Sequence, residues 1–427
     1  MNVMSISALI SARWQFAVTA SLHFLFVALT LGLVFFVAST QTRYVRTGDE
    51  VYGRMARFWG SLYAINYAVG IATGLVMEFE IGLNWSGLSR LTGDVFGAPL
   101  ALETLGAFVL ESTLLGMWLF GWGRLNKRLH LALIWGVAAT ALLSAFWVMV
   151  SNAFLQHPVG YVLDSDGRAR LTDFGALLTN SALWFALAHT VFAAMLTGGM
   201  FVAGVSAWHL RRLHRHPGGE HTEVHRRSLR TGLHSALIGM FFTMGFGYAQ
   251  FGPLGDNQPT KLAGGDDAIE RQAEMVAKYG PGDYIPNGIV GASLGIMIMV
   301  ANLLFLILLA AQILTIRDTI IKRRWARPML WLLTVLIPVP FLTAIAGWIV
   351  REEGRQPWAV YGLLKTADAV SPMSDGALLA STIGFTVLVV GLVVVDWWLL
   401  ARKARRGPGD EFLPQPLPST KGEEITV

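Results

Sequence analysis

Long apolar runs alternate with short polar segments along the whole chain. Nine such runs are visible, at about 14–40, 58–80, 97–121, 129–154, 181–209, 231–252, 288–315, 329–350 and 377–400. A helix needs about 20 apolar residues to cross a bilayer, whereas the strands of a membrane barrel are much shorter alternating segments. The pattern therefore predicts an all-α, polytopic membrane protein with nine transmembrane helices.

Composition agrees with this prediction. Hydrophobic residues make up 54% of the 427 residues and charged residues only 14%, against about 25% charged in soluble domains. The first apolar run is too long for the core of a signal peptide, so we expect it to be a retained helix. The chain has no cysteine, which excludes disulfides, iron–sulfur clusters and covalent c-type haem attachment.

The distribution of basic residues predicts the orientation. The segments after runs 1, 3, 5, 7 and 9 hold 23 of the 33 Lys and Arg residues, and cytoplasmic segments carry the excess of positive charge. We therefore expect the N-terminus outside and the C-terminus in the cytoplasm. The net charge of +5 is then mostly a topology signal, and no nucleic acid is expected as a partner.

The polar segments set the domain organisation. We expect residues 1–400 to form one membrane domain, 253–287 a long external loop, and 401–427 a disordered cytoplasmic tail. The internal segment near 209–227 is expected to be a solvated basic loop rather than a metal site. It contains five histidines: His209, His214, His216, His221 and His225.

Several polar or metal-ligating side chains fall at membrane depth in the outer half of the predicted helices. Buried carboxylates in a membrane usually face a cavity or a partner group, and His and Met are ligands of haem iron. These residues alone leave two interpretations open, an ion or proton transporter and a redox protein. The residues are His23, Glu103, Glu111, His189 and Met299, with Glu352 and Arg355 just beyond a helix end.

The two glutamates of one run are eight residues apart. In a continuous helix Glu103 and Glu111 lie on roughly the same side, about 12 Å apart along the axis. This separation suits two stations of a proton relay better than one metal site.

Five stretches of sequence resemble one known family. They are "LHFLFVALTLG" around His23, "FWGSLYAINYAVGIATGLVMEFEIGLNW" from Phe58, "GDVFGAPLALETLGAFVLEST", "NQPTKLA" at 257–263 and "AGWIVREEGRQPWA" at 346–359. Together they resemble subunit I of the cytochrome bd-type quinol oxidases, from about residue 10 to 365. The resemblance agrees with the count of nine helices.

The resemblance implies three haems and their ligands. His23 matches the axial ligand of a high-spin haem, and Glu352 the carboxylate ligand of the other high-spin haem, with Trp348 beside the pair. His189 and Met299 match the two ligands of the low-spin haem b. The implied cofactors are thus a low-spin haem b, a high-spin haem b, and a haem d or third haem b.

The resemblance also assigns roles around the haems. It implies proton delivery and haem-pocket hydrogen bonding by four residues, Glu103, Glu111, Ser112 and Ser144. Arg355 matches a partner of a haem propionate. The external loop resembles the short form of the family's quinol-binding loop, and Lys261 matches its lysine.

Two positions depart from the family pattern. Asp266 stands where the family usually has a glutamate, five residues after the loop lysine, and Asp267 follows it. A carboxylate here is expected to accept quinol protons. Met297 stands where a polar group near haem is common, and its presence is expected to alter the potential of the low-spin haem.

The expected function follows from the resemblance. The chain is expected to oxidise quinol at the outer side of a bacterial or archaeal cell membrane and to reduce O₂ to water with cytoplasmic protons. The implied partners are a second membrane subunit (subunit II), small accessory subunits and membrane lipid. The alternatives are a divergent haem- and quinone-binding protein with weak or no oxidase activity, and a haem-free transporter.

Overall fold

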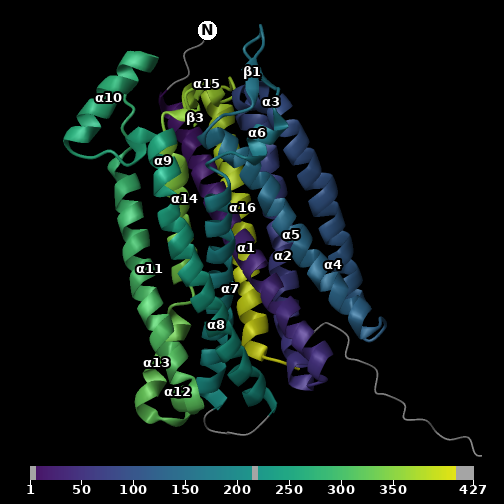
Figure 1. The fold of residues 1–427 in the computed structure, drawn as a ribbon. Coiled ribbons are helices and arrows are strands. Elements are labelled where there is room, and N and C mark those ends of the chain that lie inside the picture. The colour runs from purple at the N-terminus through teal and green to yellow at the C-terminus, as the bar shows by residue number, and fades with distance from the viewer. Residues whose placement is uncertain (1–5, 214–219, 410–427) are drawn as a thin grey trace, which may run out of the picture.

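The computed structural model describes residues 6–213 and 220–409, which form a bundle of long helices (Figure 1). Its longest helices coincide with the predicted apolar runs. They are α1 (Ile6–Thr47), α2 (Glu50–Asn84), α3 (Ser86–Ala101), α4 (Val109–Gly121), α5 (Lys127–Gln156), α7 (Trp184–Leu213), α8 (Glu220–Ala249), α11 (Gly288–Leu314), α14 (Val339–Glu352) and α16 (Asp375–Arg406).

Short elements cover the two ends of the bundle. At the end that carries the N-terminus, drawn at the top of Figure 1 and called the upper end below, lie β1 (Tyr161–Leu163), β2 (Ala169–Leu171), α6 (Phe174–Leu178), α9 (Phe251–Asn257), η2 (Pro259–Lys261), α10 (Asp266–Tyr279), β3 (Trp358–Val360), β4 (Leu364–Lys365) and α15 (Thr366–Ala369). Each strand pair is antiparallel, β1 with β2 and β3 with β4. At the lower end, α12 (Thr319–Lys322) and α13 (Arg327–Val335) connect α11 to α14.

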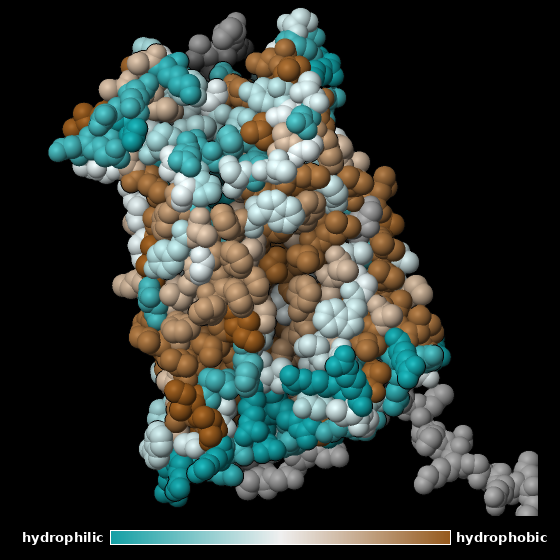
Figure 2. Space-filling model, in the orientation of Figure 1, coloured by the Kyte–Doolittle hydropathy of each residue, from teal (hydrophilic) through white to brown (hydrophobic). Residues whose placement is uncertain are grey.

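The surface of the bundle has the polarity of a membrane protein. On the face drawn in Figure 2, brown, apolar residues cover the middle and teal, hydrophilic residues gather at both ends. Within the described residues, seven helices are long and apolar enough to cross a membrane, and up to eight if the bent pair that contains α13 and α14 is one span. The all-α prediction is thus confirmed, whereas the predicted number of nine spans is not. The missing candidate is α8, whose glycines and polar side chains lower its hydropathy.

Glycines bring the central helices into close contact. A Cβ added at Gly199 of α7 would lie 2.5 Å from the backbone nitrogen of Ala236 on α8, and one at Gly239 of α8 would lie 2.5 Å from that of Leu196 on α7. Small residues at such positions let membrane helices pack backbone to backbone. The contact requires glycine at 232 and 239 of α8, because a Cβ at either position would meet the backbone of α7.

Two segments outside the long apolar runs contain helix. The expected external loop 253–287 includes most of α9, all of η2 and the 14-residue helix α10. The expected tail from residue 401 begins as helix, since α16 continues to Arg406. Residues 410–427 of that tail lie outside the described residues.

The histidine-rich segment also differs from the prediction. His209 and His225 are not solvated: they are 8% and 0% exposed, and their rings stack with centroids 3.9 Å apart. Within the described residues no group of three or more His, Asp or Glu side chains is placed to hold a metal ion. His214 and His216 lie outside the described residues, and His221 is exposed.

Candidate functional site

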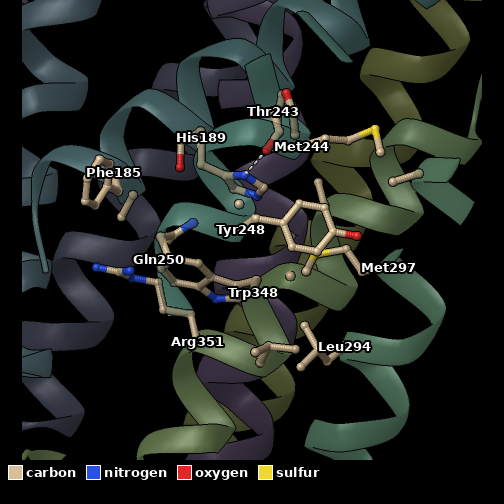
Figure 3. Close-up of a pocket in the computed structure, with 18 of the residues that line it drawn as sticks. Phe185, His189, Thr243, Met244, Tyr248, Gln250, Leu294, Met297, Trp348 and Arg351 are labelled. Atoms are coloured by element: carbon tan, nitrogen blue, oxygen red, sulfur yellow. Dashed lines mark hydrogen bonds between the residues drawn. The ribbon is translucent and has the colours of Figure 1, made fainter. Parts of the chain in front are cut away.

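A large cavity lies between α7, α8, α11 and α14 (Figure 3). It encloses about 1750 Å³, its open mouth included, and most of its wall is apolar, with Phe185, Met244 and Leu294 among the lining residues. Cavities of this kind, apolar with a few placed polar groups, are typical of cofactor sites. The polar groups of the wall therefore decide what the cavity can hold.

His189 is the first of these polar groups. It lies on α7, and its Nδ1 is 2.8 Å from the backbone carbonyl oxygen of Thr243 on α8. A carbonyl can only accept, so Nδ1 carries the proton and Nε2 keeps its lone pair. Gly247 leaves room for the ring, because a Cβ there would lie 3.1 Å from the ring atoms Cε1 and Nδ1. The imidazole is thus held as a metal ligand would be.

The methionine that shares this cavity is Met297, not Met299. Met297 of α11 lines the cavity together with His189, and a Cβ added at Gly347 of α14 would lie 3.2 Å from its sulfur. Met299 is 64% exposed and is not among the lining residues. Residues two apart on a helix point about 200° away from each other, so only one of the two can face His189. The structure does not bring Met299 to the predicted site.

A buried lysine lies at the upper part of the same cavity. Lys261 is 6% exposed, and its Nζ donates to Gln156 Oε1 (3.3 Å) and to the backbone oxygen of Arg351 (3.0 Å). Burial, together with the positive charge of Arg351, holds the pKa of Lys261 well below its usual value. A neutral amine has two N–H donors and one lone pair. With both donors engaged, the lone pair of Nζ remains available to accept a proton.

Asp266 does not join Lys261. It begins α10 with an exposed side chain. Within the described residues, no hydrogen bond or ion pair joins Asp266 to Lys261. Asp267 is also exposed, and it pairs instead with Arg271 at 3.3 Å. Among the described residues, Lys261 and Asp266 thus share no direct polar contact, and Lys261 bonds to Gln156 and Arg351 instead.

Glu352, at the end of α14, has hydrogen bonds to both carboxylate oxygens. Oε1 accepts from Asn152 (3.0 Å) and Gln156 (3.4 Å), and Oε2 accepts from Arg355 at 2.6 Å. The side chains of Glu352 and Arg355 are 12% and 6% exposed. Gln156 also accepts from Lys261, so one polar network joins the predicted carboxylate ligand to the predicted quinol lysine.

His23 has the same tautomer as His189. Its Nδ1 lies 2.9 Å from Thr73 Oγ1, and the Thr73 hydroxyl donates to the backbone oxygen of Gly70 at 2.8 Å. The hydroxyl hydrogen is therefore used, Nδ1 must be the donor, and Nε2 keeps its lone pair. Next to it, Phe24 stacks on Trp348 with centroids 5.7 Å apart, and both rings line the cavity. The two predicted haem regions thus meet through Phe24 and Trp348.

The predicted proton-delivery glutamates lie at a change in helix geometry. Glu103 belongs to a π-helix, η1 (Leu102–Phe108), which joins α3 to α4, and Glu111 belongs to α4, so the helical span is continuous but the two glutamates are not spaced as in a regular α-helix. Glu103 Oε1 accepts from Ser144 of α5 at 2.7 Å, whereas Glu111, 5% exposed, accepts from Tyr63 of α2 at 3.4 Å. The two carboxylates contact different helices, and π-turns of this kind are frequent at functional sites.

Sequence reasoning missed several polar side chains that bond to the predicted residues, namely Tyr63, Tyr67, Asn152 and Gln156. The Ser112 hydroxyl lies 3.1 Å from that of Tyr67, next to the Tyr63–Glu111 contact. Asn152 and Gln156, which hold Glu352, are four residues apart on α5. Polar residues at this spacing at the end of an apolar run share a helix face, and that signal was present in the sequence.

These residues fit the implied haem groups. Two imidazoles offer a free Nε2, a thioether lines the cavity of one of them, and most of the remaining wall is apolar, as a flat macrocycle requires. The buried Nη1 of Arg355 has no hydrogen-bond partner among the described residues, and a propionate carboxylate would satisfy it. The donor set is thus suited to haem rather than to a hydrated cation.

Known proteins resemble the chain over almost its full length. The family model described as "Cytochrome bd terminal oxidase subunit I" matches residues 11–281 and 276–408. The cytochrome bd ubiquinol oxidase subunit 1 of Bacillus subtilis (strain 168) is 37% identical over 454 residues, which cover 94% of each chain. The cytochrome bd-II ubiquinol oxidase subunit 1 of Escherichia coli (strain K12) is 34% identical, covering 95% of this chain and 98% of that one. The bd oxidase of Geobacillus thermodenitrificans superposes with a TM-score of 0.83 at 25% identity, over 96% of this chain and 100% of that chain.

Proposed function

Because the chain belongs to the cytochrome bd terminal oxidase subunit I family, we propose that it is the haem-bearing subunit of a respiratory oxidase that oxidises quinol and reduces O₂ to water. The observation that carries this proposal is a single cavity whose wall includes His189, Met297 and Lys261. It combines a site for an electron carrier with a proton acceptor for the substrate.

Four side chains are the proposed iron ligands. His189 and Met297 hold a low-spin haem b, His23 holds one high-spin haem, and Glu352 holds the other, which is a haem d or a third haem b. When bound, the haems carry the electrons and bind O₂ at an open iron position. Met297 replaces Met299 in this proposal because Met297 lines the cavity of His189. Arg355 pairs with a haem propionate, and Trp348 packs between the haem region of His189 and that of His23.

Lys261 is the proposed proton acceptor in quinol oxidation. A quinol must lose two protons with its two electrons, and a neutral amine next to its hydroxyl can take one of them. Gln156 and the backbone of Arg351 fix the Nζ atom, so its lone pair has a defined direction. Asp266 has a secondary role at most, as an exposed carboxylate that passes protons to solvent.

Glu111 and Glu103 are the proposed stations for protons drawn from the cytoplasm. Glu111 is buried beside Tyr63, and Glu103 is bonded to Ser144, so each carboxyl has a hydroxyl neighbour. Hydroxyls and carboxyls can both donate and accept, as a proton relay requires. Ser112 extends the polar contact of Glu111 toward α2 through Tyr67.

The proposed arrangement in the membrane follows the basic residues. Nine spans, with α8 as one of them, form a single domain over residues 1–400. The N-terminus and the upper end of the bundle face outside, and the C-terminus lies in the cytoplasm. Relatives are numbered as subunits of quinol oxidases, so we place this chain in a bacterial or archaeal cell membrane with a second membrane subunit and accessory subunits.

The test uses the purified complex and a matched pair of variants. Met297→Leu is expected to abolish the low-spin haem signal in the reduced optical spectrum and to stop quinol-dependent O₂ consumption, because leucine cannot ligate iron. Met299→Leu is the control, with wild-type spectrum and turnover. An unchanged spectrum in Met297→Leu, or loss of the signal in Met299→Leu, would contradict the ligand assignment. A wild-type complex without haem would contradict the function itself.

A further inference from the structure

Glu80 is a buried carboxyl group that none of the sites described above uses. It lies on α2 with 1% exposure, and neither of its oxygens has a hydrogen-bond partner among the described residues. An ionised carboxylate without donors is very costly inside a membrane protein. A group retained under these conditions calls for a physical account.

The polar group beside Glu80 identifies its protonation state. That group is the hydroxyl of Thr19 on α1. The Thr19 hydroxyl donates to the backbone oxygens of Gln15 (2.9 Å) and Phe16 (3.2 Å), so its hydrogen is not available to Glu80. A protonated carboxyl can instead donate to the lone pair of Thr19. The geometry therefore favours a carboxyl that carries its proton.

Glu80 belongs to a polar column between α1 and α2. Successive members on α1 are Gln15, Thr19 and His23, four residues apart and hence on one helix face. On α2 the corresponding positions are Thr73, which bonds His23, and Glu80, with Asn84 one turn further. The stretch from Thr73 to Asn84 is about 16 Å long at 1.5 Å per residue. It leads from the pocket of His23 to the upper end of the bundle.

Near the surface the column becomes a continuous hydrogen-bond network. The Asn84 amide donates to Gln15 Oε1 and to Ser381 Oγ, both at 2.8 Å. Thr382 donates to Gln15 Oε1 at 3.1 Å. Gln15 and Asn84 are each 1% exposed, whereas Ser381 and Thr382 of α16 are partly exposed. The network thus joins a fully buried region to the surface, and its amides and hydroxyls can line a chain of water molecules.

We propose that Glu80 is a proton-exchanging carboxylic acid that connects the pocket of His23 with the upper face of the bundle. The inference rests on the proposed function, in that haem bound at His23 changes the charge of this pocket. A positive charge in the pocket favours the ionised carboxylate, and its removal favours the neutral acid. Glu80 therefore releases a proton to the upper face on oxidation and takes one up on reduction.

Few other charged groups neighbour this column. On α1 the titratable group is His23, and Arg13 pairs with Glu353 at 2.6 Å near the surface. On α16 the acidic residues are Asp375, in the first turn, and the buried Asp396, about 22 Å along the helix from Ser381 at 1.5 Å per residue. Glu80 is thus the carboxyl placed between the His23 pocket and the network of Asn84.

The experiment is redox-difference infrared spectroscopy of the whole purified complex. A carboxyl C=O band that appears on reduction and shifts in D₂O is expected in the wild type and is lost in Glu80→Gln. The matched control is Glu78→Gln, two positions away on α2 with an exposed side chain, which retains the band. The slope of the midpoint potential of the His23 haem against pH is also expected to become shallower in Glu80→Gln and to stay unchanged in Glu78→Gln.

A second variant tests the route while keeping Glu80. Asn84→Leu is expected to retain the band but to slow its shift after transfer to D₂O, because the link to the surface is broken. A band that persists in Glu80→Gln, or exchange in Asn84→Leu as fast as in the wild type, would overturn the proposal. Haem content and quinol-dependent O₂ consumption of the wild type are recorded first. Their absence would reject the proposed function, whereas the infrared outcomes reject only the role of Glu80.

Discussion

The replacement of Glu352 by glutamine tests the energetics of the buried network at the end of α14. Arg355 Nη2 donates to Glu352 Oε2 at 2.6 Å, with side-chain exposures of 6% and 12%. The substitution keeps the shape but removes the negative charge, and it turns one accepting oxygen into an NH₂ donor. Arg355 is then left as a buried cation without its counter-ion.

The structure sets the size of the effect. Removal of one partner of a buried ion pair costs about 3–5 kcal/mol, whereas replacement of both partners is often nearly neutral. The single variant Glu352→Gln is therefore expected to destabilise the fold by about 3–5 kcal/mol, and the double variant with Arg355→Met by much less. Glu353→Gln is the control: its pair with Arg13 has side chains 30% and 35% exposed, and such pairs contribute about 0–1 kcal/mol.

The assay is thermal unfolding of the purified complex, together with the optical spectrum of the haems. Glu352→Gln is expected to lower the unfolding temperature clearly and to lose the haem that Glu352 holds, whereas Glu353→Gln changes neither. Equal temperature shifts in Glu352→Gln and Glu353→Gln would refute the argument from burial. A double variant as unstable as Glu352→Gln would show that the unpaired charge of Arg355 is not the cause.

Three further predictions concern the other parts of the site. Lys261→Met is expected to abolish quinol oxidation while an artificial electron donor still supports O₂ consumption; equal loss with both donors would argue for a general structural defect. Wild-type quinol turnover is expected to rise as the pH increases through the lowered pKa of Lys261, because only the neutral amine accepts a proton. Glu111→Gln and Glu103→Gln are each expected to slow turnover strongly with quinol and artificial donor alike, since proton supply is common to both, and full O₂ consumption in both variants would remove them from the proton path. Gly199→Leu is expected to destabilise the bundle by about 1–3 kcal/mol or more, because the new side chain meets the backbone of α8. The control is Gly245→Leu, since a Cβ at Gly245 meets nothing within 4 Å. Similar unfolding temperatures of the two variants would argue against the close contact of α7 and α8.

Local sequence determined the helical class of this protein. Apolar runs long enough to cross a bilayer have few alternatives, because a backbone in lipid must satisfy its hydrogen bonds within one helix or in a closed barrel. The same argument predicted where His23, His189 and Glu352 lie along their helices, since position on a helix converts directly into depth. The tautomers of the two histidines could not be predicted, because they depend on Thr73 and Thr243 in other helices.

Tertiary packing decided which side chains meet. Met297 and Met299 lie at nearly equal depth, so only the rotation of α11 against α8 and α14 selects the one that faces His189. Lys261 belongs to a segment whose composition is that of an exposed loop, yet the fold buries it against Gln156 and Arg351.

The same limit applies to the carboxylates. The sequence placed Glu103 and Glu111 on one helical span, but the π-helical geometry at Glu103 and the contacts with Ser144 and Tyr63 depend on packing against α5 and α2. Glu80 was one more acidic residue in an apolar run until the fold set it between α1 and α2 without a hydrogen-bond donor. Hydrophobic pattern and depth follow from the order of residues along one helix, whereas a site requires the relative rotation of several helices, which no single run of sequence specifies.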